Sequence, residues 1–577
     1  MGGVAAEVNI LGLNAFHGDS AAARWRDGEF AFAIEEERLN RIKHWAGFPA
    51  LACEACLTGV TPGEIEHVAI GRDTNANLAR KVAYVASHPA AFRQALSRYR
   101  NRSAVTGLPE RLQAMGLGHA RLHFVEHHRA HLASAFFASP FEEAAVVSID
   151  GFGDFSSAMW GVGRGNRIDV RGSVRFPHSL GIFYSAFTQL LGFPHYGDEY
   201  KMMGLAAYGA PRFAPAVRNV VRVEGDQIRL NLDYFVHHAG GSEMTWDNGA
   251  PTIAPLYSER MADEFGLARE AGADLAASVQ LVFEEVCFAF LRHVQSETGM
   301  KNLAYAGGVA LNCAANGKLF GETPFESIYI PPAPNDAGIA MGSALYVAHQ
   351  ILGQPRGATM THAYFGPEFG EREIRSALEA AGVVFESFES EAALLRETAA
   401  RIARGSVTGW FQGRMEFGPR ALGNRSILAD PRRADMKDIL NHRIKRRESF
   451  RPFCPSILAE AQPQYFTIGA ASPFMVQAYP FRPEVRGRIP AVVHEDGTGR
   501  IQTVTPGANP RYWGLLKEFE AVAGVPLLVN TSFNENEPIV NNPADALSCF
   551  LRTDMDLLVL GNHIVSKPES GRGGRNF

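Results

Sequence analysis

The sequence predicts a two-domain α/β protein whose N-terminal domain is built from two similar halves. Three observations support this fold class. The chain has 577 residues, which is more than one hydrophobic core usually supports. Short apolar strand patterns alternate with amphipathic helical patterns, and one strand–turn–strand pattern occurs twice. A linker-like segment at 353–357 places a boundary near residue 357, which gives domains of residues 1–357 and 358–577.

Composition excludes several classes of protein. Hydrophobic residues make up 46% of the chain and charged residues 20%, as in globular domains. The net charge of -5 offers no basic field for a phosphate backbone, so we expect no nucleic-acid partner. No run approaches the ~20 apolar residues of a membrane span. The six cysteines are too scattered for a disulfide framework, which indicates core cysteines and a cytoplasmic location.

The N-terminal strands and turns carry an internal repeat. Residues 8–13, 20–26 and 29–34 read as strands, and 35–44 as a charged helix. Residues 11–21 align with 147–157, because each is a buried strand, a polar residue, a glycine-bearing turn with an aspartate, and a return strand. Glycine in such turns lets backbone N–H groups approach a phosphate. This arrangement resembles the actin/sugar-kinase superfamily, whose two halves clamp a nucleotide.

The remainder of the first domain fits the same reading. Residues 303–312 form a strand that runs into the Gly307-Gly308 turn and then a helix. An apolar stripe over 275–290 predicts the core face of a long helix. A rigid loop at 331–338 carries Asp336 and leads into an apolar helix at 339–351.

Candidate metal ligands lie at three places in this domain. His127 and His131 are four residues apart at the head of a predicted helix and share one face of it. With 19 histidines in the chain, chance alone also produces such pairs. Asp150 at a strand end and Asp336 in the loop complete a set that suits Fe²⁺, Mn²⁺ or Zn²⁺. His17, at the tip of the first turn, is a candidate general base; the alternative is a turn histidine that bonds its own backbone.

Sequence motifs that could bind a ligand are denser in the second domain than in the first. A strand is expected at 407–411, and the Arg- and Gly-rich run at 409–428 reads as a loop between a strand and a helix. Residues 444–453 add a scarce lysine, and 527–534 is a buried strand that ends in polar residues. Lys, Arg and hydroxyl groups at strand ends suit a triphosphate and a second phosphorylated substrate. The alternative for the Arg-rich run is a solvated surface.

Eight motifs in order along nearly the whole chain resemble one family, the ATP-dependent O-carbamoyltransferases of the NodU/CmcH type. The motifs lie at 12–17, 36–44, 127–131, 148–151, 200–209, 307–312, 418–426 and 530–534. The resemblance implies an N-terminal domain like the tRNA threonylcarbamoyl transferase and a YrdC-like C-terminal α/β domain. It also implies two steps: the C-terminal domain makes carbamoyl-adenylate from carbamoyl phosphate and ATP, and the N-terminal domain transfers the carbamoyl group to an acceptor hydroxyl.

The resemblance also assigns roles to individual residues. His17 would be the base, with iron or a similar divalent ion held by His127, His131, Asp150 and Asp336. Mg²⁺ would accompany ATP. Nucleotide contacts in the N-terminal domain would come from Lys43, Gly151, Gly307, Gly308 and Asn312. Carbamoyl phosphate and ATP in the C-terminal domain would be held by Arg420, Lys445, Arg451, Asn530 and Ser532.

Other functions are weighed against this one. A tRNA threonylcarbamoyl transferase shares the first domain, but the acidic net charge and the large second domain oppose it. A non-catalytic ATP clamp would need neither His17 nor a metal set. A metalloprotease would need a glutamate base that the histidine motif lacks. The expected acceptor is a hydroxylated small molecule of secondary metabolism, such as an antibiotic, with its pocket formed from stretches such as 45–120 and 210–265. A homodimer is compatible with these features.

Overall fold

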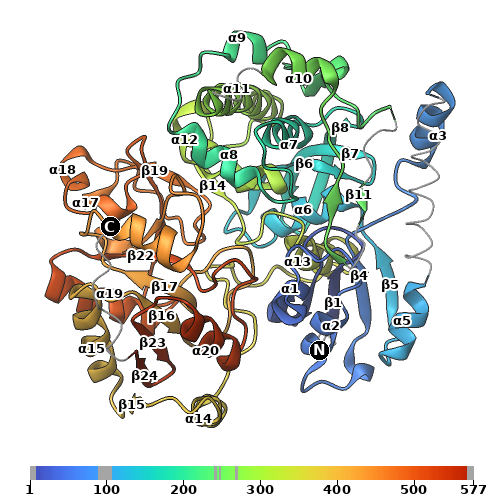
Figure 1. The fold of residues 1–577 in the computed structure, drawn as a ribbon. Helices are drawn as coiled ribbons and strands as arrows, with labels where there is room; N and C mark the ends of the chain where they lie inside the picture. Colours follow the sequence, from blue (N-terminus) through green and yellow to red (C-terminus); the bar gives the residue numbers. More distant parts are fainter. Residues whose placement is uncertain (1–7, 89–106, 240–243, 246–248, 267–270, 568–577) are drawn as a thin grey trace. The chain divides into compact units, whose positions relative to one another are not determined.

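The computed structural model describes residues 8–88, 107–239, 244–245, 249–266 and 271–567 (Figure 1). The chain divides into two compact units, Met1–Met360 and Thr361–Phe577. Each unit contains helices and a β-sheet core, so the fold is mixed α/β as predicted. The division lies close to residue 357, where the linker-like segment suggested a boundary.

The first sheet of unit 1 has five strands in the order β3-β2-β1-β4-β5. Its strands are β1 (Asn9–Asn14), β2 (Ala21–Arg26), β3 (Glu29–Glu35), β4 (His67–Ile70) and β5 (Arg121–Phe124). β1 pairs antiparallel with β2 and parallel with β4. The tight turn between β2 and β3 uses Asp27 and Gly28, both at positive φ, which matches the right-handed twist of a hairpin.

The second sheet repeats this order. Its strands run β8-β7-β6-β13-β14, with β6 antiparallel to β7 and parallel to β13. They are β6 (Glu143–Gly153), β7 (Ser156–Arg164), β8 (Arg167–Arg175), β13 (Asn302–Ala306) and β14 (Ser327–Tyr329). The two segments aligned in the sequence therefore fall on equivalent hairpins, β1–β2 and β6–β7, of two sheets with one topology.

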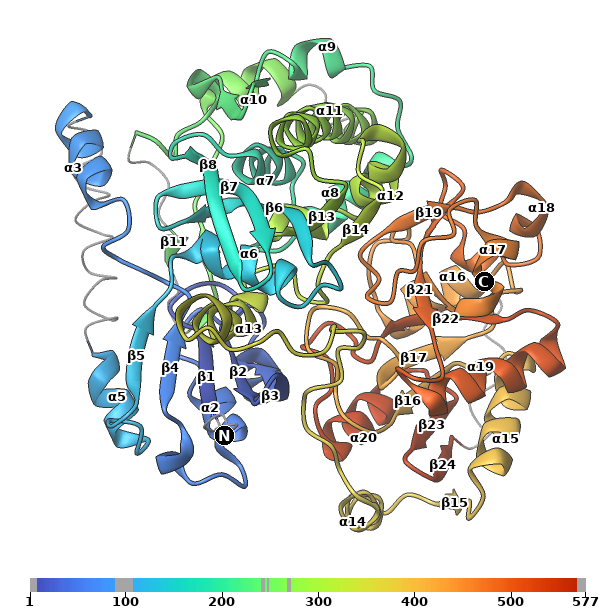
Figure 2. The same ribbon diagram turned by 180° about the vertical axis from the view of Figure 1, so that it is seen from behind.

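Two helices lie between the sheets, as Figures 1 and 2 show. α13 (Gly338–Leu345) packs against β1, β2 and β4, and α6 (His127–Phe136) packs against β6, β7 and β13. The two helices also contact each other. Glycine makes these approaches feasible: a Cβ on Gly12 would lie 2.0 Å from the Ala340 carbonyl oxygen, and one on Gly342 would lie 1.9 Å from that of Ala130.

Further helices cover the outer faces of both sheets. α11 (Gly272–Thr298) contacts β6 and β7, and the predicted stripe over 275–290 is buried in the core. α2 (Ala50–Leu57) contacts β2 and β3, and both of its cysteines are buried, like the other four. The other α-helices among the described residues of unit 1 are α1 (Glu36–Asn40), α3 (Leu78–Ser87), α5 (Leu108–Ala114), α7 (Leu180–Leu190), α8 (Glu199–Ala206), α9 (Ala214–Val217), α10 (Glu259–Phe265) and α12 (Cys313–Glu322).

Helix α1 is shorter than predicted. The expected helix over 35–44 ends at Asn40, because Arg41 adopts the left-handed conformation with φ 65° and its N–H bonds the Glu37 carbonyl oxygen. His44 is also at positive φ, 56°. The chain after α1 is therefore a tight loop rather than a further helical turn.

Unit 2 contains one mixed sheet of eight strands in the order β15-β24-β23-β16-β17-β22-β18-β21. Its strands are β15 (Phe385–Ser387), β16 (Thr408–Phe411), β17 (Arg425–Ala429), β18 (Cys454–Leu458), β21 (Gln502–Val504), β22 (Leu527–Ser532), β23 (Leu557–Leu560) and β24 (His563–Ser566). The longer helices are α14 (Glu371–Ala380), α15 (Glu391–Ala403), α19 (Pro510–Ala523) and α20 (Pro543–Arg552).

The prediction of a helix after the Arg- and Gly-rich run was wrong. That run connects β16 to β17, and the two strands pair antiparallel. The apolar residues after Arg425 are bounded by ladders on both sides, to β16 and to β22, so they form a buried strand. Across the described parts of the chain, no helix combines the length and apolar character that a membrane crossing requires.

Candidate functional site

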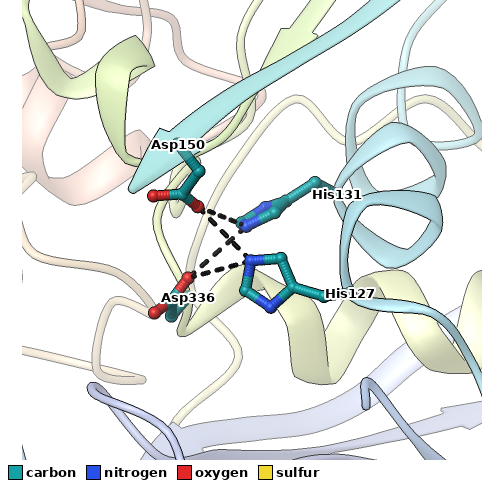
Figure 3. A group of neighbouring side chains, drawn as sticks. All are labelled: His127, His131, Asp150 and Asp336. Carbon is teal, nitrogen blue, oxygen red and sulfur yellow. Dashed lines mark ion pairs between the residues drawn. The ribbon is translucent and has the colours of Figure 1, made fainter. Parts of the chain in front are cut away.

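Four predicted ligands meet in unit 1, between its two sheets. His127 and His131 project from one face of α6, Asp150 lies near the end of β6, and Asp336 lies in the loop before α13 (Figure 3). One ligand atom of each residue lies within 4.8 Å of all the others. His131 Nε2 is 2.9 Å from Asp150 Oδ2 and 3.4 Å from Asp336 Oδ1. The corresponding distances from His127 Nε2 are 3.5 Å and 3.7 Å.

The facing atoms of this quartet fit a divalent cation. The two imidazole Nε2 atoms and Asp150 Oδ2 are buried and lack well-aligned hydrogen bonds among the described residues. Buried polar atoms normally have partners, so their convergence calls for one shared ligand. Two imidazoles and two carboxylates match the donor preferences of Fe²⁺, Mn²⁺ and Zn²⁺. Burial opposes the charged form of His131, but Asp150 and Asp336 outweigh it and raise its pKa to about 9 in the metal-free protein.

Surrounding groups fix the orientation of the histidines. Asp154 accepts a hydrogen bond from the His127 backbone N–H at 3.0 Å. Gly153 lies against the imidazole of His127, where a Cβ would come within 2.0 Å of Cγ. The middle histidine of the motif, His128, faces away from the quartet and bonds Ser148 Oγ at 2.9 Å. Such partners hold metal-binding side chains in position.

His17 lies directly beside this quartet. Its Nδ1 is 2.5 Å from Asp336 Oδ2, so one carboxylate faces the quartet through Oδ1 and His17 through Oδ2. The alternative of a turn histidine bonded to its own backbone is therefore not what the structure shows. Burial lowers the pKa of His17, but Asp336 raises it by more, so the net shift is upward. In the tautomer whose Nδ1–H donates to Asp336, Nε2 is available to accept a proton.

Three of the predicted nucleotide-binding residues cluster around Asp150. Gly307 has φ +91°, and a Cβ there would lie 2.2 Å from the Ile149 carbonyl oxygen. A Cβ on Gly308 would lie 2.8 Å from Asp150 Oδ1. Gly151 donates its N–H to Asp150 Oδ1 at 2.7 Å and has open space on its Cβ side. At these glycines the backbone lies beside the quartet without a side chain to cover it.

The other two predicted nucleotide-binding residues lie in different surroundings. The amide of Asn312 accepts the N–H of Ala315 at the start of α12 and pairs with Gln280 at 3.0 and 3.1 Å. Its side chain is therefore engaged in holding α11 and α12 together. Lys43 is exposed in the loop that follows α1. The stretches expected to form an acceptor pocket include 89–106, 240–243 and 246–248, which lie outside the described residues.

In unit 2, Lys445 is buried beside the end of β22. Its Nζ donates to the carbonyl oxygens of Ser532 and Asn534, at 2.5 and 2.7 Å, and to Asn534 Oδ1 at 2.6 Å. Burial lowers the pKa of Lys445 far below its usual range, and the positive charges of Arg447 and Arg451 lower it further. The predicted pair Lys445 and Ser532 is thus in direct contact.

Hydrogen bonds tie the segments of the remaining predicted residues of unit 2 to β22 and to the residues before Lys445. Asn530, two residues before Ser532 on β22, donates to Ser456 Oγ at 2.9 Å and to the Ala421 carbonyl oxygen at 3.2 Å. It therefore ties β22 to the loop that carries Arg420. The Arg451 carbonyl oxygen accepts from Asn441 at 3.1 Å, which ties the Arg451 segment to the turn before Lys445.

Sequence comparison decides the family. Residues 9–345 match the family described as carbamoyltransferase N-terminus, and residues 399–567 match the one described as carbamoyltransferase C-terminus. The chain belongs to the carbamoyltransferase family. It is therefore a transferase of carbamoyl groups, as the resemblance predicted.

Relatives of this carbamoyltransferase include two nodulation proteins. Nodulation protein NolNO of Sinorhizobium fredii is 39% identical and aligns over 97% of this chain and 80% of its own. Nodulation protein NolO of Bradyrhizobium diazoefficiens is 40% identical over 77% of this chain and 79% of its own. An uncharacterized protein of Synechocystis sp. is 41% identical over 97% of both chains.

Several residues around the two sites of the carbamoyltransferase were not predicted. In unit 1, His44 Nδ1 lies 2.7 Å from Asp19 Oδ1, and Asp19 Oδ2 accepts from Asn335 at 2.8 Å. This chain of contacts ties the first turn to the loop that carries Asp336. Asp19, Glu37 and His44 also lie close enough to share an ion, but Asp19 and His44 already bond each other. Burial lowers the pKa of His44, whereas Asp19 raises it by more, to about 9.

In unit 2, two buried charged residues shape the loop that carries Arg420. Glu416 Oε1 accepts the backbone N–H groups of Leu422, Asn424 and Arg425 at 2.7–3.2 Å. The Arg425 guanidinium lies 3.7 Å from the centre of the Phe411 ring and donates to the carbonyl oxygens of the loop, at 2.5 Å for Gln412. Both residues are inside the predicted Arg-rich run, but the sequence alone does not distinguish this structural arginine from Arg420.

Proposed function

We propose that this carbamoyltransferase is ATP-dependent and acts in two steps, one in each unit. Unit 2 would convert carbamoyl phosphate, ATP and water into carbamoyl-adenylate, phosphate and pyrophosphate. Unit 1 would transfer the carbamoyl group from the adenylate to a hydroxyl of a small-molecule acceptor and release AMP. The observation that carries the proposal is the carboxylate of Asp336, which faces both the quartet and His17 and so joins a cation site to a base.

The fold of unit 1 supports a nucleotide clamp. Its two sheets share one topology, and the hairpins β1–β2 and β6–β7 occupy equivalent places. We infer that these are the two halves of an actin/sugar-kinase-like domain, and that Gly151, Gly307 and Gly308 approach the adenylate through bare backbone. Lys43 would reach the nucleotide from the exposed loop after α1. For unit 2 we infer a YrdC-like domain.

The quartet would hold Fe²⁺ or a similar divalent ion. Such an ion, when bound, supplies Lewis-acid stabilisation of the phosphate charge that develops as AMP leaves. His127, His131, Asp150 and Asp336 would hold it from α6, β6 and the loop before α13. Asp336 would at the same time fix the ring of His17.

His17 would take the proton of the acceptor hydroxyl. An alcohol is a weak nucleophile near neutral pH, and a positioned imidazole typically contributes ~10²–10⁴-fold. Asp336 holds Nδ1, so Nε2 is the atom that receives the proton. As in serine hydrolases, the carboxylate orients the ring and stabilises its protonated form.

In unit 2, a basic cluster formed by Arg420, Lys445 and Arg451 would bind the phosphates. Lys445 is buried near other positive charges, and no carboxylate appears among its hydrogen-bond acceptors. A bound phosphate would restore the charge of this lysine and offset its burial. Arg420 and Arg451 would bind oxyanions from the adjoining segments, while Asn530 and Ser532 would position them. Mg²⁺ would accompany the ATP.

The proposal is tested by incubating the protein with carbamoyl phosphate, ATP, Mg²⁺ and a panel of hydroxylated natural products. We expect pyrophosphate release that depends on carbamoyl phosphate, and a mass increase of one carbamoyl group on at least one acceptor. A tRNA substrate serves as the comparison, because the net charge of -5 disfavours it. Carbamoylation of tRNA alone, or ATP binding without pyrophosphate release, would contradict the proposal.

A further inference from the structure

The proposed transfer site has a base and a cation site, but its named side chains include no neutral hydrogen-bond donor. When a hydroxyl attacks the carbamoyl carbonyl, the carbonyl oxygen gains negative charge. A donor aimed at that oxygen commonly contributes ~10²–10³-fold. Asp150 and Asp336 are carboxylates and only accept hydrogen bonds. A hydrogen-bond donor to that oxygen would come from another side chain or from the backbone.

Tyr196 places a hydroxyl group against the first turn, which carries the proposed base. It lies in the segment between α7 and α8, and its Oη packs against Gly18, the residue after His17. A Cβ on Gly18 would lie only 2.3 Å from this Oη. Burial raises the pKa of Tyr196 well above 10, and the negative charges of Asp19, Asp336 and Asp150 raise it further. The phenol therefore stays protonated and able to donate.

The ring of Tyr196 is held in place by the unpredicted His44. The two rings meet edge to face, with centroids 5.3 Å apart. His44 is itself fixed by Asp19 at 2.7 Å. The next residue, Gly197, has φ +83°, and a Cβ there would lie 2.6 Å from His44 Nε2. Two segments remote from Tyr196 in sequence, the first turn and the loop that carries His44, thus converge on this phenol.

The hydroxyl of Tyr196 differs from those of two other tyrosines in unit 1. Tyr184 donates to Gln280 at 2.8 Å and Tyr234 donates to Glu264 at 2.7 Å. Within the described ranges, Tyr196 Oη makes no hydrogen bond to a protein group. A donor beside a proposed base and without a protein acceptor is suited to a substrate oxygen.

We propose that Tyr196 is a further catalytic residue, whose Oη–H donates to the carbonyl oxygen of the carbamoyl group during transfer. This role rests on the proposed function. In the step, the acceptor oxygen forms a bond to the carbamoyl carbon, and the bond from that carbon to the phosphate oxygen of AMP breaks. The hydroxyl proton passes to His17 Nε2, and the tyrosine keeps its proton.

Tyr196→Phe tests this role, with Tyr234→Phe as the matched control because it also removes one buried hydroxyl from unit 1. In Tyr196→Phe we expect the kcat of transfer to fall by ~10²-fold. Pyrophosphate release, the KM for the acceptor and the metal content should match those of the wild type. Tyr234→Phe should transfer at the wild-type rate. Gly18→Ala keeps the phenol, but the added methyl group would displace the Tyr196 hydroxyl. We therefore expect this variant to lower the kcat of transfer as well.

Wild-type transfer by Tyr196→Phe would overturn the role. A loss of metal from that variant would also overturn it, because the phenol would then support the site rather than the substrate. Failure of the proposed function would be detected in the wild-type protein rather than in the Tyr196→Phe variant. The wild-type protein itself would then yield no carbamoylated product, and the role of Tyr196 would fall with it.

Discussion

The two units gather different kinds of ionisable side chains. In unit 1, carboxylates and imidazoles from α6, β6, the first turn and the loop before α13 surround one point. In unit 2, Lys445 lies near Arg447 and Arg451, and its hydrogen-bond acceptors are carbonyl, amide and hydroxyl oxygens. The first set suits a cation and a moving proton, whereas the second suits phosphate. From this difference we predict that the two proposed half-reactions can be lost separately.

The largest effect on one half-reaction is expected from Arg420→Ala. Removal of this proposed oxyanion donor should abolish pyrophosphate release that depends on carbamoyl phosphate. Exposed Arg443, on the turn before Lys445, gives the matched control Arg443→Ala, which should behave as wild type. Undiminished release in a folded Arg420→Ala protein would remove this arginine from the phosphate site.

His127→Ala should act on unit 1 alone. Loss of one imidazole leaves the quartet with three ligands, so metal content should fall from about one equivalent to a small fraction of that. Transfer should fall with it, and pyrophosphate release should persist. Elemental analysis of protein purified without added metal checks this, with exposed His119→Ala as the control. Full metal content in His127→Ala would make the histidines purely structural.

Gly12→Ala should destabilise unit 1 without touching either cluster. Its Cβ would meet the Ala340 backbone 2.0 Å away, and backbone cannot yield as a flexible side chain can. Overpacking of this kind typically costs ~1–3 kcal/mol. Denaturant unfolding should show an earlier transition for unit 1, while pyrophosphate release stays unchanged. An unshifted transition would show that α13 can move away from β1.

The smallest effect concerns the pH dependence of stability through His44. Its folded pKa is raised from 6.5 to about 9, because Asp19 outweighs burial. The charged pair therefore stabilises the fold fully below pH 6.5, and this stabilisation is lost as the pH rises through about 9. The difference in melting temperature between wild type and His44→Gln should be largest near pH ~6 and should decrease as the pH rises toward ~10. A difference that does not change with pH would contradict an ionic role.

The sequence predicted those parts of unit 1 that leave a local signal. The spacing of His127 and His131 on a helix is such a signal, and so is an acid at a strand end or in a proline-rich loop. Asp336 was predicted as a ligand, but its second contact, with His17, arises only when the loop before α13 meets the first turn. Tyr196 and Asn335 have no spacing that marks them, because their neighbours come from distant segments.

Contacts between segments that are distant in sequence account for the errors. The charged pattern over 35–44 favours a helix, yet positive φ at Arg41 and His44 breaks it after Asn40. Tertiary contacts impose that geometry, since neither residue prefers it. In unit 2, the Arg- and Gly-rich run was expected to lead from a strand into a helix, and periodicity alone cannot distinguish a short buried strand from a helix. Ladders to β16 and β22 decide in favour of the strand.

The division of labour is tested most directly by measuring both half-reactions in His17→Asn. Asparagine can still bond Asp336 but cannot accept the hydroxyl proton. We expect pyrophosphate release close to that of the wild type, and carbamoyl transfer reduced by ~10²-fold or more. Parallel loss of both half-reactions in a folded, metal-loaded His17→Asn protein would contradict the separation of the two steps between the units.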